Sequence, residues 1–277
     1  MRKNKLNRQV YHRNISRMIQ YAFAIIMAIS MAFPFYWMIV TAMKTPQELS
    51  VFPPKLLPES FNIDNFIEVV ERRAFLTYMK NSIIYSVLET ALLLIITILA
   101  AYGFHMMQSR FKKTIFLFLL LTGAIPFEVV MIFNYKLIID WELHNNLWAL
   151  ILPFVCNFFD VFILYTAFNG IPRSLYYSAK LDKSSNANYL FRIALPYVRP
   201  TIIFICLMNM VGAWNSFLWP LLVTSSDATR TLPIGIYSFI PENGSKTELV
   251  MAMSVLSQIP MVLMYFLFQK HIKREKQ

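Results

Sequence analysis

The chain reads IPRSLYYSAKLDKSSNANYLFRIALPYVRP from residue 171 to residue 200, a polar stretch between two long apolar runs. A connection that only reverses the chain needs a handful of residues, and this one has 30. Leu175, Ala179 and Asp182 follow one another at helical spacing, so they share one face of a first short helix. A second helical stretch, 185–194, ends at the proline that follows it. Two short helices that meet at an angle would fit a groove on a soluble partner; an interfacial hairpin that caps a bundle is the other interpretation.

The composition indicates a membrane protein. Hydrophobic residues make up 57% of the chain, charged residues 15%, and the mean hydropathy is +0.50. A helix needs about 20 residues to cross the hydrocarbon core of a bilayer, and six apolar runs are that long. They are 19–42, 81–104, 114–136, 147–169, 200–222 and 247–269. The sequence therefore predicts an all-α membrane protein with six transmembrane helices.

The distribution of basic residues orients these spans. With a cytoplasmic N-terminus, 18 of the 26 Lys and Arg residues fall in cytoplasmic segments, as the positive-inside rule requires. Six spans return the C-terminus to the same side. The net charge of +11 is thus explained by topology. We expect no nucleic-acid partner, because the basic residues are scattered over four segments bounded by membrane.

The remaining segments divide the chain into regions. Residues 1–18 form a basic cytoplasmic tail, and residues 19–75 hold the first span and an external segment. Residues 76–270 form the membrane core, which includes the 171–200 loop, and residues 271–277 form a second cytoplasmic tail. In the external segment, the apolar residues near position 70 are compatible with a short amphipathic helix or with a solvated loop. These residues are Phe66, Val69, Val70 and Phe75.

Different short motifs are spread over most of the chain. They are Pro34-Phe35-Tyr36-Trp37-Met38 with Lys44, Pro126 with Tyr135, Ile151-Leu152-Pro153, Ile171-Pro172-Arg173-Ser174-Leu175, Ser178-Ala179-Lys180-Leu181-Asp182, Ile193-Ala194-Leu195-Pro196, Ala213-Trp214-Asn215-Ser216-Phe217-Leu218-Trp219-Pro220 and Thr231-Leu232-Pro233. Together they resemble the importer permeases of the ATP-binding cassette (ABC) superfamily, of the carbohydrate type. The resemblance is nearest to the second permease of maltose-type systems.

This resemblance implies a fold and a set of partners. The fold would be the type I ABC importer permease fold, in which residues 171–200 form the coupling loop (the EAA loop) that inserts into a cleft of a separate ATPase. The partners would be a second permease subunit in a heterodimer, a dimer of ABC ATPases, an extracellular or periplasmic solute-binding protein, and membrane lipid. The chain would lie in the cytoplasmic membrane of a prokaryote.

The coupling loop both keeps and departs from the family pattern. Its glutamate position falls on Tyr177 and its usual glycine on Lys183. Glycine permits a backbone geometry that other residues reach only with strain, so either this loop turns differently or its ATPase has adapted. The resemblance implies that the following residues couple to the ATPase: Ala179, Lys180, Asp182, Lys183, Leu195 and Pro196.

Acidic residues inside apolar runs are costly in lipid and by default face a bundle interior or a wet cavity. Glu128 is about 14 residues into one outward-running span, and Trp214 and Asn215 are about 14 residues into another, so both levels lie roughly 21 Å from the inner face of the membrane. A carboxylate and an amide bind sugar hydroxyls, and an indole packs against a pyranose ring. We predict substrate contacts from these three residues; alternatively, Glu128 is paired within the bundle and Trp214 belongs to an interfacial aromatic belt. We assign structural roles to Glu89 and Asp160.

Other chemistry is missing from the sequence. No G-x-x-x-x-G-K-[ST] loop is present to cradle a nucleotide phosphate. The four histidines are scattered, and Cys156 and Cys206 lie in apolar runs, where cysteine behaves as a small hydrophobe. The sequence therefore predicts no catalytic residue, no cofactor and no metal site, and it assigns ATP hydrolysis to a separate subunit.

These observations predict a permease subunit of an ATP-driven importer that moves a saccharide across the cytoplasmic membrane. An importer of the same architecture for glycerol phosphate or another polar solute is a second hypothesis. An ion-coupled secondary transporter that uses Glu128 and Asp160 is a third, and a structural membrane anchor is a fourth.

Overall fold

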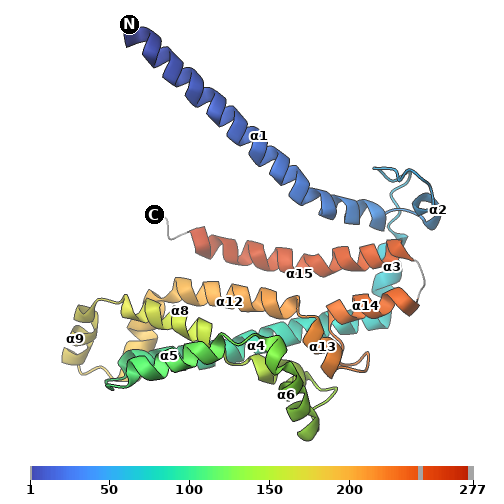
Figure 1. The fold of residues 1–277 in the computed structure, drawn as a ribbon. Coiled ribbons are helices and arrows are strands. Elements are labelled where there is room, and N and C mark those ends of the chain that lie inside the picture. The colour runs from blue at the N-terminus through green and yellow to red at the C-terminus, as the bar shows by residue number, and fades with distance from the viewer. Residues whose placement is uncertain (1, 243–245, 274–277) are drawn as a thin grey trace. The chain divides into compact units, whose positions relative to one another are not determined.

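The computed structural model describes residues 2–242 and 246–273, and the regular elements in these ranges are all helical (Figure 1). The predicted all-α fold class is confirmed. The 271–277 tail falls largely outside the described residues. The elements are α1 (Arg2–Ala42), α2 (Pro46–Leu49), α3 (Asp64–Glu71), α4 (Arg73–Met106), α5 (Lys112–Gly123), α6 (Phe127–Asp140), α7 (Leu147–Ile151), the 3-10 turn η1 (Leu152–Phe154), α8 (Phe158–Asn169), α9 (Arg173–Leu181), α10 (Asn186–Tyr189), the π-turn η2 (Leu190–Ala194), α11 (Leu195–Tyr197), α12 (Arg199–Trp214), α13 (Leu218–Val223), α14 (Leu232–Glu242) and α15 (Thr247–Lys273).

The chain divides into two compact units. The first runs to Glu71 and includes Ile240–Leu256, and the second comprises Arg72–Phe239 and the chain from Ser257 onward. The second unit contains every candidate site residue named above. The candidate site can therefore be described within the second unit alone.

Three of the predicted spans are single helices and three are bent. Ser16–Ala42, Ala74–Met106 and Thr247–Phe268 are each long and apolar enough to cross a membrane. The other three spans are helix pairs: α5 with α6 bends by 85°, α7–η1 with α8 by 50°, and the helices of 186–197 with α12 by 75°. Counting each bent pair as one span gives six.

Proline explains where the first two bends fall. Pro126 precedes α6, and Pro153 lies in the 3-10 turn before α8. Pro196, in contrast, does not end its helix as predicted, because the helical chain continues to Tyr197. A wider π-turn comes just before it: the Leu195 N–H donates to the carbonyl of Leu190, five residues back. Proline has no N–H to satisfy, so it continues this turn as the first-turn residue of α11.

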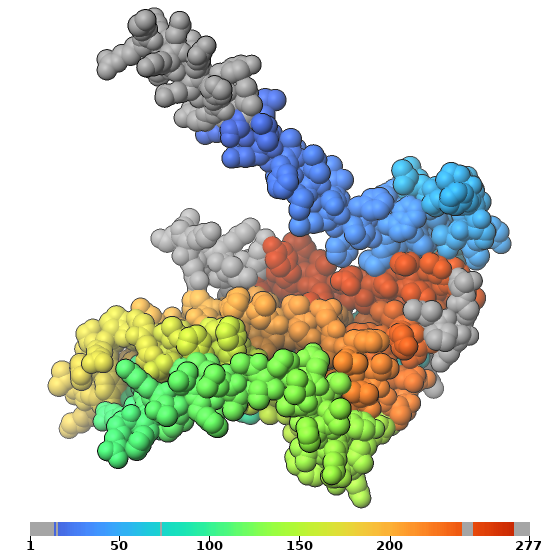
Figure 2. Space-filling model, in the orientation of Figure 1, coloured from blue at the N-terminus to red at the C-terminus, as the bar shows by residue number. Residues whose placement is uncertain are grey.

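The surface of α1 matches a lipid environment. Its large apolar side chains from Met18 onward stand exposed along the helix, which is the blue segment of Figure 2. Met18 is 71% exposed and Ile29 64% exposed. Apolar surface of this extent on a helix long enough to span a bilayer is stable when hydrocarbon covers it. The N-terminal basic segment continues the same helix.

Lys44 organises the chain after α1 in the first unit. Its side chain is only 1% exposed, its Nζ donates to the Lys55 carbonyl at 2.5 Å, and it lies 4.7 Å from the Trp37 ring centroid. A buried ammonium needs such partners. Asn65 adds hydrogen bonds from its amide to the carbonyls of Ala42 (2.9 Å) and Lys44 (3.0 Å).

The segment predicted to be external contains a helix. Residues 64–71 form α3, in which Val69 is fully buried, so the helical alternative is confirmed there. Phe75, predicted for the same helix, instead belongs to α4, which begins eight residues before the predicted span. Its hydrophobic side chain is buried, which explains the early start.

The core of the second unit is built around α4. Helices α8 and α12 pack along α4, and α8 also contacts α5 (Figure 1). Leu93, Leu164 and Ile205 are each at most 1% exposed and hold this core together. Ala179 and Tyr189 of the 171–200 loop join the same cluster, so the loop is packed onto the ends of the spans.

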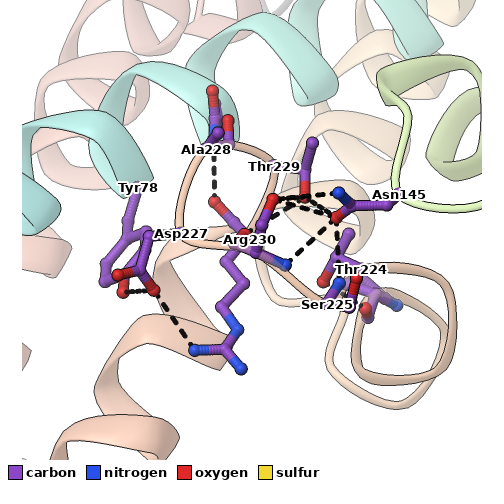
Figure 3. Close-up of polar contacts among 11 residues, drawn as sticks. Tyr78, Asn145, Thr224, Ser225, Asp227, Ala228, Thr229 and Arg230 are labelled. Carbon is purple, nitrogen blue, oxygen red and sulfur yellow. Dashed lines mark hydrogen bonds and ion pairs between the residues drawn. The ribbon is translucent and has the colours of Figure 1, made fainter.

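Away from the 171–200 loop, Asn145 forms a network of hydrogen bonds with residues 223–229, which we call the polar clamp. Asn145, in a left-handed conformation (φ 59°), accepts hydrogen bonds from the backbone N–H groups of Ser225 (3.0 Å) and Ser226 (3.1 Å) and from the Thr229 hydroxyl (Figure 3). Its own N–H donates to the Val223 carbonyl at 2.8 Å. Asparagine tolerates this backbone conformation better than most residues.

The clamp is tied to α4 by a second set of contacts. Tyr78 donates its hydroxyl proton to Asp227 at 2.6 Å, and Asp227 also pairs with Arg230 at 3.2 Å (Figure 3). Asn81 donates to the carbonyls of Ala228 and Arg230. The loop after α13 is therefore held as a structured element.

Candidate functional site

Two adjoining hollows lie between the apolar helices of the second unit. Their volumes are about 240 and 490 Å³, and they share Glu89, Phe154 and Asn209 as lining residues. We call them together the central cavity. Glu89 comes from α4 and Asn209 from α12, the two helices that pack most extensively on each other. The cavity thus lies along the main helix contact of the unit.

Asn209 is fixed so that its carbonyl oxygen stays available. Its amide nitrogen donates one hydrogen bond to Asp160 Oδ2 (2.8 Å) and one to the Ile205 carbonyl (2.9 Å). Both amide hydrogens are therefore used, and the remaining oxygen can only accept. Glu89, 4% exposed, meets the hydroxyl of Thr90 only at 3.5 Å, so its carboxyl group also has capacity to accept hydrogen bonds.

Aromatic rings complete the wall of the central cavity. Phe154 lies 4.7 Å from Phe127, centroid to centroid, and 6.3 Å from Trp219. Trp219 is 2% exposed and donates its indole N–H to the Ala149 carbonyl at 2.9 Å, which holds the group in place. Acceptor oxygens next to aromatic rings suit a solute that has both hydroxyl groups and apolar C–H faces.

The 171–200 loop is helical in two stretches, as predicted: α9, and the helices of residues 186–197. We call Arg173–Tyr197 the elbow. Helix α9 ends at Leu181, and the Ser184 N–H returns to the Ala179 carbonyl at 2.9 Å. Ser185 caps the next helix by accepting from the Asn188 N–H at 3.1 Å. These contacts fix the turn between the helices.

Lys183 sits at the tightest point of the elbow, with φ 53°. This is the left-handed region that glycine enters without strain, and a lysine pays about 1 kcal/mol or more to occupy it. Thus the backbone keeps the geometry for which glycine is suited, although the residue is different. Of the two alternatives considered for this departure, a different turn is not needed.

Residues 94–276 match the family described as binding-protein-dependent transport system inner membrane component. The match covers more than half of the chain. The chain belongs to this permease family. The prediction of a transport subunit rather than an enzyme is thereby confirmed.

Several similar proteins are also ABC transporter permeases. This permease is 32% identical over 254 residues to a probable ABC transporter permease protein of Mycoplasma genitalium, covering 87% of this chain and 80% of that one. It is 32% identical to the trehalose/maltose transport system permease protein of Thermococcus litoralis, covering 90% and 91%. The crystal structure of a bacterial ABC transporter involved in the import of the acidic polysaccharide alginate has a chain with the same fold (TM-score 0.84, 19% identity, 94% and 97% covered).

The three residues predicted as substrate contacts are not brought together by hydrogen bonds in the described part of the permease. Glu128 is exposed in the first turn of α6, beyond the 85° bend, so a residue count along one axis does not give its depth. Trp214 is 6% exposed. Asn215 caps the end of α12 and donates to the Val211 carbonyl at 2.9 Å.

The predicted coupling residues differ in exposure: Lys180, Asp182, Lys183 and Pro196 are exposed, whereas Ala179 is buried and Leu195 is partly buried. Ala179, Asp182 and Lys183 line a shallow hollow of about 700 Å³. Lys180 is exposed and donates to Asn186 Oδ1 at 2.8 Å. Further along the elbow, partly buried Leu195 packs on the helical core and Pro196 is exposed. These placements are given by the burial of each side chain and by the core contacts.

Two residues of the central cavity were not predicted as site residues. Glu89 was assigned a structural role, and Asn209 was not singled out. The available signal was a lone amide in the apolar 199–214 stretch together with two acids in other spans. Among the described residues, no group of His, Cys, Asp and Glu side chains could hold a metal ion.

Proposed function

We propose that this permease carries an uncharged saccharide through the central cavity of an ATP-driven importer. The observation that carries the proposal is the chemistry of the cavity wall: acceptor oxygens from Glu89 and Asn209 beside the Phe154 and Phe127 rings. Sugar hydroxyls donate to such oxygens, and the C–H face of a sugar ring packs on such rings. The trehalose/maltose relative supports this class of cargo.

The same wall argues against glycerol phosphate. No Lys, Arg or His lines either hollow of the central cavity within the described residues. A buried anion needs a paired cation or several hydrogen-bond donors; the hydroxyl groups of Tyr85 and Ser216 are donors in this wall, but the Glu89 carboxyl group beside them disfavours a second negative charge. A phosphate would therefore find no counter-ion from this chain.

The elbow would connect transport to ATP hydrolysis. We place coupling to an ABC ATPase dimer at Ala179, Lys180, Asp182, Lys183, Leu195 and Pro196. The partners would also include a second permease and an extracellular or periplasmic solute-binding protein. In this arrangement both chain termini and the elbow face the cytoplasm, which fits the distribution of basic residues.

The test is ATP hydrolysis by the complete transporter in proteoliposomes. With the solute-binding protein present, neutral oligosaccharides should stimulate hydrolysis and glycerol phosphate should not. Asp182→Lys should lower stimulated hydrolysis by roughly tenfold, since the change reverses a charge at the proposed contact. Asp140→Lys, a similar reversal on exposed α6, is the matched control. Stimulation by glycerol phosphate alone would refute the cargo, and unaltered coupling in Asp182→Lys would refute the coupling site.

Orientation is tested separately. A cysteine introduced at Lys183 should react with a membrane-impermeant maleimide only after the cytoplasmic face is opened. Labelling from outside intact cells would exclude the proposed topology. Insensitivity of uptake to proton and sodium uncouplers would exclude the ion-coupled alternative.

A further inference from the structure

A second pocket, distinct from the central cavity, opens where the spans meet the elbow. Its volume is about 500 Å³, and its walls come from the end of α4, the start of α5, the junction of α8 with α9, and Tyr189 of α10. We call it the elbow pocket. It is formed entirely by the second unit. Any ligand held there would touch both the membrane helices and the elbow.

The elbow pocket is basic. Lys112 and Arg173 line it, and no acidic residue does within the described part of the chain. Lys112 Nζ donates to the His105 carbonyl at 3.3 Å and lies 5.1 Å from the Tyr165 ring, so its position is fixed without a carboxylate. His105 Nδ1 donates to Asn169 Oδ1 at 2.9 Å, which leaves Nε2 of the ring to another partner.

Two helices begin at this pocket without side-chain caps. Lys112 is the first residue of α5 and Arg173 the first residue of α9, and neither helix has a capping side chain at its N-terminus. The first N–H groups of a helix lack intrahelical partners and favour a negative charge. Two cations and two such helix starts therefore favour the same kind of ligand, an anion with several acceptor oxygens.

Tyr189 gives an independent indication of a ligand. Its side chain is 2% exposed and lines the pocket, and its ring packs edge-on against Tyr176 at 5.2 Å. Its hydroxyl group forms no hydrogen bond with any described residue, whereas the nearby Tyr102 hydroxyl donates to the Asn186 carbonyl at 3.0 Å. The hydroxyl group is therefore free to donate to a molecule held in the pocket.

We infer that the elbow pocket binds a phosphate group carried by a small polar molecule. Arg173 and Lys112 would neutralise the phosphate, the Tyr189 hydroxyl would donate to one oxygen, and the Tyr176 and Tyr177 rings would cover the organic part. A soluble sugar phosphate and a phospholipid headgroup both carry this chemistry. Bound there, the ligand joins α5 to α9 and so restrains the elbow. The binding step is independent of the cargo; only its effect on coupling rests on the proposed function.

Binding is measured first on the purified full chain in lipid-free detergent by isothermal titration. Glucose 6-phosphate should bind and glucose should not. Arg173→Gln combined with Lys112→Gln should weaken binding at least about tenfold, since charge-assisted hydrogen bonds are lost. Arg110→Gln, a nearby exposed cation outside the pocket, is the matched control. A second arm compares phosphatidylcholine nanodiscs with and without phosphatidate, using native mass spectrometry to detect retained lipid.

Tyr189→Phe separates a ligand contact from a structural role. It should weaken phosphate binding several-fold and leave the unfolding temperature unchanged, because the hydroxyl has no protein partner. Binding of glucose 6-phosphate alone identifies a soluble ligand, and retention of phosphatidate alone identifies a lipid; either supports the site. Binding of neither, or equal binding in the double variant, overturns it. Saccharide-stimulated ATP hydrolysis in the double variant shows independently whether the proposed function holds.

Discussion

The central cavity and the elbow pocket lie in one unit and along one helix, yet their chemistry is opposite. Glu89 and His105 are 16 residues apart on α4, or about 24 Å. Among the residues that the structure describes, Glu89 and Asn209 give the cavity acceptor oxygens and no Lys, Arg or His lines it; the pocket has Lys112, Arg173 and two uncapped helix starts, and no Asp or Glu lines it. An uncharged solute suits the first and a phosphate suits the second. The permease can therefore keep a cargo path and an anion site apart by the charge of their walls alone.

Placing a cation in the central cavity should have the largest effect. Asn209→Lys removes the acceptor oxygen and brings an ammonium group into the wall next to Asp160. We expect uptake of the saccharide to fall at least about tenfold, because the lysine pairs with the acid and fills the cavity. The measurement is uptake of radiolabelled saccharide into proteoliposomes at equal protein content.

Asn215→Lys serves as the discriminating variant. Asn215 is exposed at the end of α12 and lines neither hollow. If this variant loses uptake and Asn209→Lys does not, the cargo contacts lie at the residues predicted from sequence. The proposal that the saccharide passes through the central cavity is then wrong.

Salt should distinguish the two sites next. Raising NaCl from about 0.05 M to about 0.5 M shortens the screening length severalfold, so binding of glucose 6-phosphate at the elbow pocket should weaken several-fold. Saccharide-stimulated hydrolysis should change by less than about twofold at matched ATPase activity, because the cargo contacts involve no ion pair. Titration calorimetry and a coupled ATPase assay give the two values. If salt weakens glucose 6-phosphate binding and saccharide-stimulated hydrolysis equally, the two sites do not differ in charge as proposed.

The hydrogen bond between Asp160 and Asn209 should contribute an intermediate amount to stability. Asp160→Leu leaves an amide hydrogen of Asn209 without its partner, and we expect the free energy of unfolding to fall by about 1–3 kcal/mol. Asp160→Asn, which keeps an acceptor, should lose less. Thermal unfolding in detergent measures both, with exposed Asp140→Leu as the control. No difference between the two Asp160 variants would mean that the bond does not hold the cavity wall.

Helices, their order and the elbow could be predicted from this sequence because each has a local signal. Apolar runs of sufficient length predicted the spans, and the helical spacing of Leu175, Ala179 and Asp182 predicted α9. The cavity residues could not be found in the same way. Pro126 shows why: an 85° bend there moves everything after it off the straight axis on which the depth of Glu128 was calculated. The partnership of Asp160 with Asn209 joins residues 49 positions apart, which no local pattern specifies.

Lys183 offers the smallest effect, on the elbow side of the comparison. Its left-handed φ of 53° costs a lysine about 1–2 kcal/mol, and glycine would recover part of this while losing more chain entropy on folding. We expect Lys183→Gly to stabilise the elbow by up to about 1 kcal/mol. Lys180→Gly, three residues earlier inside α9, should instead destabilise it by roughly 1 kcal/mol. Both changes are measured as the protection of the elbow amides against hydrogen exchange, followed by mass spectrometry. Increased protection in Lys183→Gly with decreased protection in Lys180→Gly would show that the backbone of the turn is strained by lysine. Decreased protection in both variants would mean that side-chain contacts of Lys183 stabilise the elbow by more than its backbone strain costs. The shape of the elbow would then depend on side chains rather than on a turn suited to glycine.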